Sequence, residues 1–206
     1  MKKLSTVQIL YVYLISKIFV ISASFILVVI FGENAVSIVK ESALYIVLDA
    51  LIVIFAFFNL SFINNNFKKA AIFKIATVII SVIGSLAANS SPVITYNFFL
   101  SDILQFLELV LALPTVYYLY SGFGELATVN NDNFLSAKWQ KIRYIRIFFA
   151  VLSIIGCLLF LYEFFATNLL FAMLFSILLP LVSFIIEIIE LLYAVKTIKI
   201  TKETIN

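Results

Sequence analysis

Six long apolar stretches alternate with short polar segments along the chain. Each stretch has about 20 residues or more, enough for a helix to cross a hydrocarbon core of about 30 Å at about 1.5 Å per residue. The pattern predicts an all-α fold, a bundle of six transmembrane helices in a single domain over residues 1–206. The expected spans are Gln8–Phe31, Ala43–Ile63, Ala70–Ala88, Asn97–Ser121, Tyr144–Ala166 and Leu169–Val195.

The first apolar stretch follows Met1-Lys2-Lys3, so it also has some features of a signal peptide. Lys17 interrupts the stretch, and the apolar run then continues to Phe31. That run is longer than the apolar core of a signal peptide. We therefore expect a retained membrane span rather than a cleaved leader.

Basic residues outside the spans lie almost entirely on one side of this six-span arrangement. The opposite side carries only Lys40. By the positive-inside rule, both termini are expected in the cytoplasm, together with a long loop over Gly122–Arg143, and the protein in the bacterial cytoplasmic membrane. The residues on the basic side are Lys2, Lys3, Lys68, Lys69, Lys138, Lys141, Arg143, Arg146, Lys196, Lys199 and Lys202.

Composition agrees with a membrane protein and excludes several kinds of chemistry. Hydrophobic residues make up 64% of the chain and charged residues 12%, whereas soluble domains are about half apolar and about a quarter charged. The chain has no His and a single cysteine, Cys157, so it has no Ser-His-Asp triad, no HExxH zinc site and no internal disulfide. We expect no enzymatic activity, no cofactor and no metal site, and the net charge of +3 does not favour nucleic acid as a partner.

Two hairpins of the predicted bundle align with each other at a shift of 72 residues. Ser81–Leu86 aligns with Ser153–Leu158, and Phe67 aligns with Trp139. Apolar spans with basic flanks resemble one another in any case. The sequence therefore leaves internal duplication and coincidence equally open.

The C-terminal half, from about Asp102 onward, carries an ordered set of features. They are Ala112-Leu113-Pro114, Tyr117-Tyr118-Leu119-Tyr120, an Asn-rich loop, a basic run over Lys138–Arg146, and a last span that ends in Lys196 and Lys199. This order resembles the domain-of-unknown-function family 2975 of small bacterial multi-pass membrane proteins. Members of that family have fewer spans and no assigned activity, and their genes often neighbour helix-turn-helix regulators. The resemblance implies a membrane protein linked to regulation.

Charged residues inside the spans are the first candidates for a site, since each is unfavourable in hydrocarbon by about 2.5–3.5 kcal/mol. Counted from the cytoplasmic ends of their spans, Lys17 and Glu187 lie at a similar depth of about 12–14 Å. We expect them to form a buried ion pair that joins the first span to the last. Lys74 and Glu190 match in depth in the same way. An assembly contact is the favoured role for the Lys17–Glu187 pair, and a role in transport is the alternative.

A second candidate is an intramembrane polar site on the fourth span. Asp102, Gln105 and Glu108 recur every three residues, within an arc of about 120° on one helix face. That face is expected to point into the bundle, and Pro114 is expected to kink the helix one turn or more further on. Such a site could carry a cation or a proton with Glu108 as its carboxylate. A protonated Glu108 that hydrogen-bonds a neighbouring helix explains the pattern equally well.

Two charged surfaces complete the predicted sites. An acidic outer rim could bind a cationic peptide or simply reach water, and its residues are Glu33, Glu41, Asp49, Asp102 and Glu163. A basic cytoplasmic face could meet the anionic inner leaflet or an acidic protein partner, and its residues are Lys138, Lys141, Arg143 and Arg146.

The sequence therefore predicts a non-enzymatic multi-pass membrane protein with a regulatory, immunity or protective role, which acts through a partner. The alternative is a small solute or cation carrier, or the substrate-binding membrane subunit of a transporter, built on Asp102, Gln105 and Glu108. The lipid bilayer surrounds the protein in both cases, and both are compatible with a homo-oligomer.

Overall fold

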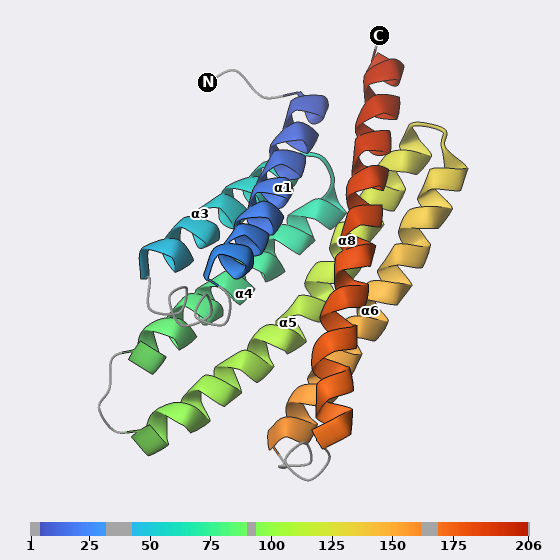
Figure 1. Ribbon diagram of the computed structural model, residues 1–206. Coiled ribbons are helices and arrows are strands. Elements are labelled where there is room, and N and C mark those ends of the chain that lie inside the picture. The colour runs from blue at the N-terminus through green and yellow to red at the C-terminus, as the bar shows by residue number, and fades with distance from the viewer. Residues whose placement is uncertain (1–4, 32–42, 90–93, 162–168, 206) are drawn as a thin grey trace.

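The structure, a computed structural model, describes residues 5–31, 43–89, 94–161 and 169–205, and all of its regular elements are α-helices. The prediction of an all-α fold is thus confirmed for these residues. Figure 1 shows α1 and α3 on one side and α6 and α8 on the other, with α4 and α5 running obliquely from one side toward the other. The helices are α1 (Thr6–Phe31), α3 (Ala43–Leu60), α4 (Asn65–Asn89), α5 (Ile94–Val129), α6 (Asn133–Leu161) and α8 (Leu169–Ile205).

One described segment, Ile103–Val129 of α5, is long and apolar enough to cross a membrane by length and composition. Thr6–Phe19 and Ala50–Leu60 are apolar as well, but shorter. The α5 helix runs on through Pro114 without a break, because neighbouring groups in a helix can accommodate the hydrogen bond that proline removes.

The prediction of a long loop over Gly122–Arg143 is wrong as to its conformation, because this segment is helical apart from a short turn between Val129 and Asn133. Its apolar residues recur at helical spacing, and the ones that are buried are Phe123, Leu126, Ala127, Leu135, Trp139 and Ile142. Polar and basic residues between them conceal this period in the sequence. At the same end, α8 continues ten residues past its predicted limit, Val195, to Ile205.

The turn between α5 and α6 is fixed by its own backbone. Asn131 adopts a left-handed conformation with φ of 60°, and the amide of Asp132 donates to the carbonyl of Ala127 at 2.9 Å. These are the features of a Schellman helix end. Asp132 then caps α6, since its Oδ1 accepts a hydrogen bond from the amide of Leu135 at 2.7 Å.

Replacing Asp132 with Ala is expected to lower the free energy of unfolding by about 1 kcal/mol at neutral pH. The backbone hydrogen bond from Leu135 and the nearby Lys196 ammonium lower the pKa of the Asp132 carboxyl from its ordinary value of 3.8. A folded-state pKa below the unfolded one means that the stabilisation is present above the unfolded pKa and is lost as pH falls through the folded pKa. Thermal unfolding in detergent should therefore show wild type and variant converge in acid. Asp132→Asn keeps a cap acceptor and should stay close to wild type at neutral pH; a loss equal to that of Ala would contradict the cap.

The packed core lies at the end of the bundle that carries the chain termini and the α5–α6 turn (Figure 1). Trp139 of α6 stacks on Phe123 of α5, with ring centroids 4.6 Å apart. Phe67 of α4 meets the same Phe123 edge-on, at 4.9 Å. The two residues aligned in the possible duplication, Phe67 and Trp139, thus contact one shared ring. The largest fully buried side chains are Leu10, Leu60, Phe67, Phe123, Leu135, Trp139 and Thr197.

Gly122 allows α4 and α5 to approach closely. A Cβ added there would lie 2.8 Å from the ring of Phe67, which is fully buried and has little room to move. Gly122→Ala is therefore expected to destabilise the protein by about 1–3 kcal/mol, measured as thermal unfolding in detergent. Gly124→Ala is the control on the same helix, because its added Cβ would lie 3.7 Å from the nearest atom. A neutral or stabilised Gly122→Ala variant would refute the close contact.

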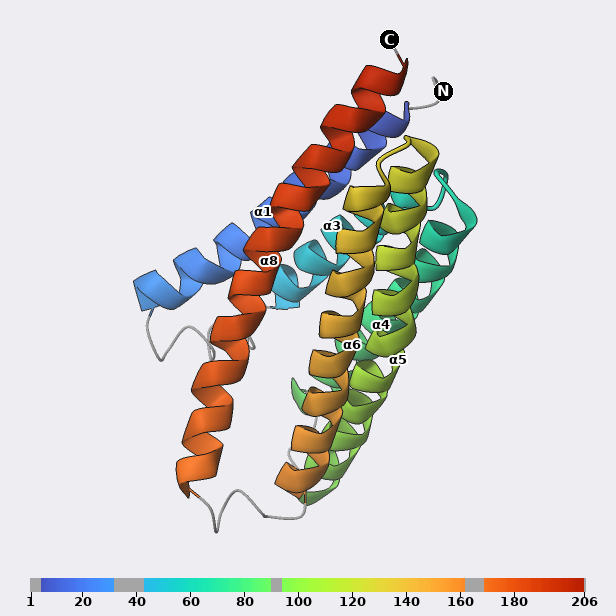
Figure 2. The same ribbon diagram turned by 90° about the vertical axis from the view of Figure 1, so that its right-hand side faces the viewer.

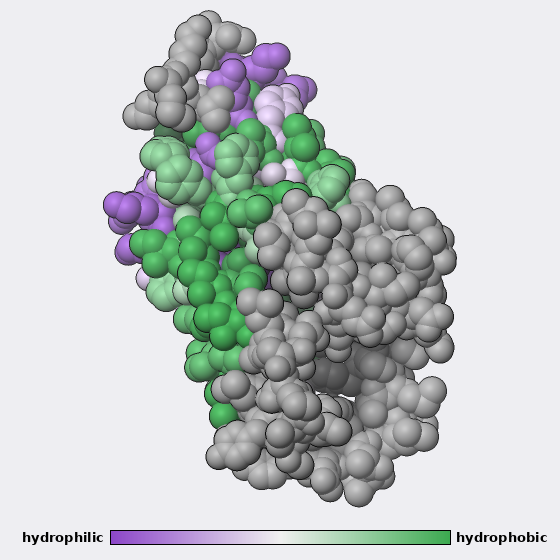
Figure 3. All heavy atoms as spheres, turned by 90° about the vertical axis from the view of Figure 1, so that its left-hand side faces the viewer, coloured by the Kyte–Doolittle hydropathy of each residue, from purple (hydrophilic) through white to green (hydrophobic). Residues whose placement is uncertain are grey.

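Large apolar side chains remain exposed along the outer sides of the helices. Examples that are more than half exposed are Ile15, Phe55, Ile72, Phe148 and Leu192. Figure 3 shows hydrophobic residues as a broad region of one face, with hydrophilic residues gathered toward one end. An apolar surface of this extent does not suit water.

Candidate functional site

A buried cluster of charges joins three helices at the centre of the bundle. Glu190 of α8 is 2% exposed, and its two carboxylate oxygens contact the ammonium of Lys17 on α1 and the guanidinium of Arg146 on α6. The hydroxyl of Tyr120 on α5 also hydrogen-bonds Glu190. A buried carboxylate needs such partners to compensate for the loss of water.

Arg146 extends the charge cluster from Glu190 toward the start of α8. Its guanidinium lies 3.7 Å from the carboxylate of Glu187 and donates a 2.9 Å hydrogen bond to the hydroxyl of Ser183. Two acidic and two basic side chains therefore balance one another. The arrangement holds α1 and α6 to a single stripe of α8.

The predicted partner of Lys17 is wrong by one helical turn, although the two helices that the pair joins are the predicted ones. Lys17 contacts Glu190, and Glu187 pairs with Arg146 instead. Matching residues by depth assumes parallel helices, whereas α1 runs obliquely to α8 (Figure 2). The role of Arg146 was missed because the sequence assigns it to the cytoplasmic basic face. Its place near the start of an apolar stretch was the available signal.

The basic residues expected on one cytoplasmic face point in different directions. Arg146 belongs to the charge cluster, and Arg143 donates a 2.8 Å hydrogen bond to Ser121 and lies over the ring of Tyr117. Of the four, only Lys141 is fully exposed. The reason is that, at about 100° per residue, they spread over about 200° of the helix. The prediction of a single basic face is corrected for Lys138, Lys141, Arg143 and Arg146.

The polar residues of α5 are not brought together as one inward-facing site. Gln105 is exposed, and Glu108 is half-buried. The Glu108 carboxylate interacts electrostatically with Lys74 and hydrogen-bonds Ser81, both on α4. Lys74 therefore interacts electrostatically with Glu108. Glu190, which was expected at the same depth as Lys74, contacts Lys17 and Arg146 instead. The side chain of Asp102 lies outside the described residues.

The predicted acidic outer rim lies outside what the structure describes. Its side chains are those of Glu33, Glu41, Asp49, Asp102 and Glu163, and none of them is among the described ones. Within the described part of the chain, no three His, Cys, Asp or Glu side chains lie close enough together to hold a metal ion.

Two cavities lie beside α5. The first, of about 270 Å³, is lined by residues of α1, α3, α4 and α5, including Lys17 and Lys74. The second, of about 350 Å³, lies between α5, α6 and α8 and is lined in part by Arg146. Ala112 and Val116, one helical turn apart on α5, line both cavities, so the two cavities adjoin the same stripe of this helix.

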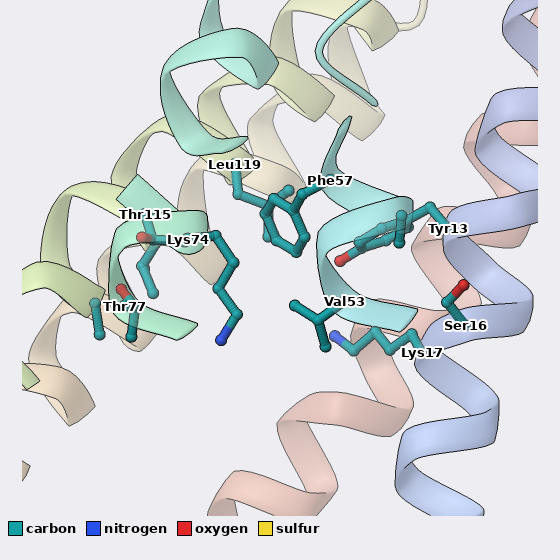
Figure 4. A pocket seen from close by; sticks show the side chains of 12 residues that line it. Tyr13, Ser16, Lys17, Val53, Phe57, Lys74, Thr77, Thr115 and Leu119 are labelled. Carbon is teal, nitrogen blue, oxygen red and sulfur yellow. The ribbon is translucent and has the colours of Figure 1, made fainter. Parts of the chain in front are cut away.

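Figure 4 shows the first cavity from close by, with Lys17 and Lys74 reaching toward it from different helices. The Tyr13 hydroxyl also points toward this space, and Val53 projects into it from α3. The cavity thus combines two ammonium groups with a largely apolar wall. This combination suits an amphiphilic ligand better than a wholly polar one.

Comparison of the chain with protein-family models, curated proteins and solved structures gives no significant match.

Proposed function

We propose that the chain is a non-enzymatic multi-pass protein of the bacterial cytoplasmic membrane, with six spans and both termini in the cytoplasm, and that it regulates or protects through a bound partner. The observation that carries the membrane location is the exposure of large apolar side chains on the outer sides of its helices. Basic side chains collect at the end with the termini, as the positive-inside rule requires for a cytoplasmic end.

The topology can be tested with single cysteines in a Cys157→Ser background. Thr204→Cys and Asn131→Cys are expected to resist a membrane-impermeant maleimide in intact cells and to react after permeabilisation. Ser91→Cys, between the third and fourth predicted spans, is expected to react in intact cells. Labelling of Thr204→Cys from outside would overturn the proposed orientation.

The partner is proposed to be an acidic protein at the cytoplasmic end. Lysine side chains at this end are exposed, among them Lys141, Lys199 and Lys202. They lie on the exposed faces of α6 and α8, on helices rather than on a loop. A rigid basic surface favours rapid, salt-sensitive association with an acidic protein. The resemblance of the C-terminal half to family 2975 agrees with a regulatory partner.

Purification from native membranes in mild detergent, followed by mass spectrometry, is expected to recover one protein in stoichiometric amount. Replacing Lys141, Lys199 and Lys202 together with Glu should remove that protein. Replacing the same three with Arg should retain it, because the charge is unchanged. Recovery of the chain without any partner would refute this part of the proposal.

A small carrier is the second candidate, favoured by the two cavities beside α5 and by Glu108 between α4 and α5. In this case Glu108→Gln should abolish proton- or cation-coupled uptake while the variant still folds. Uptake that persists in Glu108→Gln would rule out Glu108 as the coupling group.

A further inference from the structure

We propose that the cavity between α1, α3, α4 and α5 binds a monoanionic amphiphile, whose anionic head lies between Lys17 and Lys74. The apolar chain of this ligand lies along Val53, Phe57 and Val116. The inference rests on the membrane location proposed above, because a bilayer is the source of such a molecule.

The ammonium groups of Lys17 and Lys74 are the charged hydrogen-bond donors that line the cavity. Thr77 and Thr115 line it, but their hydroxyls donate to the carbonyls of Phe73 and Leu111 at 2.8 and 3.0 Å. Each hydroxyl hydrogen is therefore engaged with the backbone of its own helix, so that these hydroxyls can accept a hydrogen bond from a ligand but not donate one. Donors to a ligand come mainly from the ammonium groups, which attract anions and repel cations.

The lysines and their acidic neighbours together determine which ligand charge the cavity favours. Lys17 has three N–H groups and contacts Glu190, while Lys74 acts on Glu108. Each lysine thus has an acidic neighbour that offsets part of its charge, so the cavity favours one negative charge over two. A fatty carboxylate or the phosphodiester of a lipid has this charge. Basic pockets between helices on the cytoplasmic side of a membrane are suited to such heads.

The apolar wall sets the second requirement. Val53, Ala56, Phe57, Ala112, Val116 and Leu119 provide it. A cavity of about 270 Å³ corresponds to roughly nine waters in the liquid, enough for a head and a short length of chain. The remainder of a longer chain must extend beyond the cavity, toward exposed apolar side chains such as Phe55.

The test uses the full-length protein in nanodiscs of neutral phosphatidylcholine, with empty nanodiscs as background for partitioning. Laurate is expected to bind in a one-to-one ratio, and dodecanol, which has the same chain and no charge, at least tenfold more weakly. Phosphatidylglycerol serves as the second anionic probe: competition with laurate assigns the site to a lipid head as well, and no competition confines it to the carboxylate, so either result specifies the monoanion that binds.

Two variants separate the cavity from the bilayer. Val53→Phe fills the cavity without altering charge and should weaken laurate binding at least tenfold, and Lys74→Gln should do the same by removing one ammonium. Leu51→Phe is the control on the same helix, because Leu51 is exposed, and it should bind laurate like wild type. Equal binding of dodecanol, displacement of laurate by inorganic phosphate, or unchanged binding in Val53→Phe would overturn the inference. Since the measurement needs no protein partner, a failed partner search would leave it standing.

Discussion

Glu190→Gln is expected to destabilise the protein by about 3–5 kcal/mol, the largest effect of any single charge substitution in the described bundle. The substitution removes the carboxylate that both Lys17 and Arg146 contact. Two cations then remain close together in a region from which water is excluded, with only the more distant Glu187 to offset them. Thermal unfolding of the purified protein in detergent, followed by circular dichroism, measures the loss.

The neighbouring carboxylate provides the control for this experiment. Glu187 is 33% exposed and lies 3.7 Å from Arg146, so Glu187→Gln should lower stability by less than about 1 kcal/mol. Equal effects of Glu187→Gln and Glu190→Gln would mean that the cluster is not centred on Glu190. The reverse order would restore Glu187 as the partner of Lys17.

Trp139→Ala is expected to be as damaging, with a loss of about 3–5 kcal/mol. Trp139 is 1% exposed and stacks on Phe123, and its indole N–H donates to the hydroxyl of Thr197 at 3.1 Å. Truncation leaves a cavity where α5, α6 and α8 meet, and it leaves the Thr197 hydroxyl without this donor. The readout is again thermal unfolding in detergent.

Phe134→Ala is the matched control on the same helix, because this aromatic side chain is 65% exposed. Its loss should change stability by no more than about 0.5 kcal/mol. Trp139→Phe should fall between wild type and Trp139→Ala, since it keeps the aromatic stacking and loses the hydrogen bond. A Trp139→Ala variant as stable as Phe134→Ala would show that the aromatic core does not hold these helices together.

The positions of the helices could largely be predicted, because an apolar run of about 20 residues is a strong local signal. The ends of the helices around the α5–α6 turn and at the end of α8 could not. In Gly122–Arg143 the buried residues alternate with Lys, Arg, Asn and Glu, so the segment has the composition of a loop and the period of a helix. The Asn-rich run indicates the turn at Asn131 and the cap at Asp132. The apolar faces of the helices on either side could not be recognised, because polar residues lie between their apolar residues.

The candidate site was predicted less well than the fold, for geometric reasons. The prediction that Lys17 pairs with a residue of the last helix is correct. The choice between Glu187 and Glu190 as that residue depends on the tilt of α1, and counting residues along the chain does not give this tilt. The sequence groups Arg146 with the other basic residues near it. Because a helix turns by about 100° per residue, its side chain points in another direction than theirs. The first cavity, with Lys17 and Lys74 on its walls, depends on helices far apart in sequence, so no local pattern indicates it.

The contact between Lys17 and Glu190 can form only late in the synthesis of the protein. The two residues are 173 positions apart, and at about 5–20 residues per second a ribosome needs on the order of 10–35 seconds to connect them. During that interval the lysine of the nascent first helix must find water, a lipid phosphate or a chaperone. The first helix can form early, but Lys17 gains the Glu190 carboxylate only after α8 has been made, so a chain that ends before Glu190 carries this positive charge without that partner.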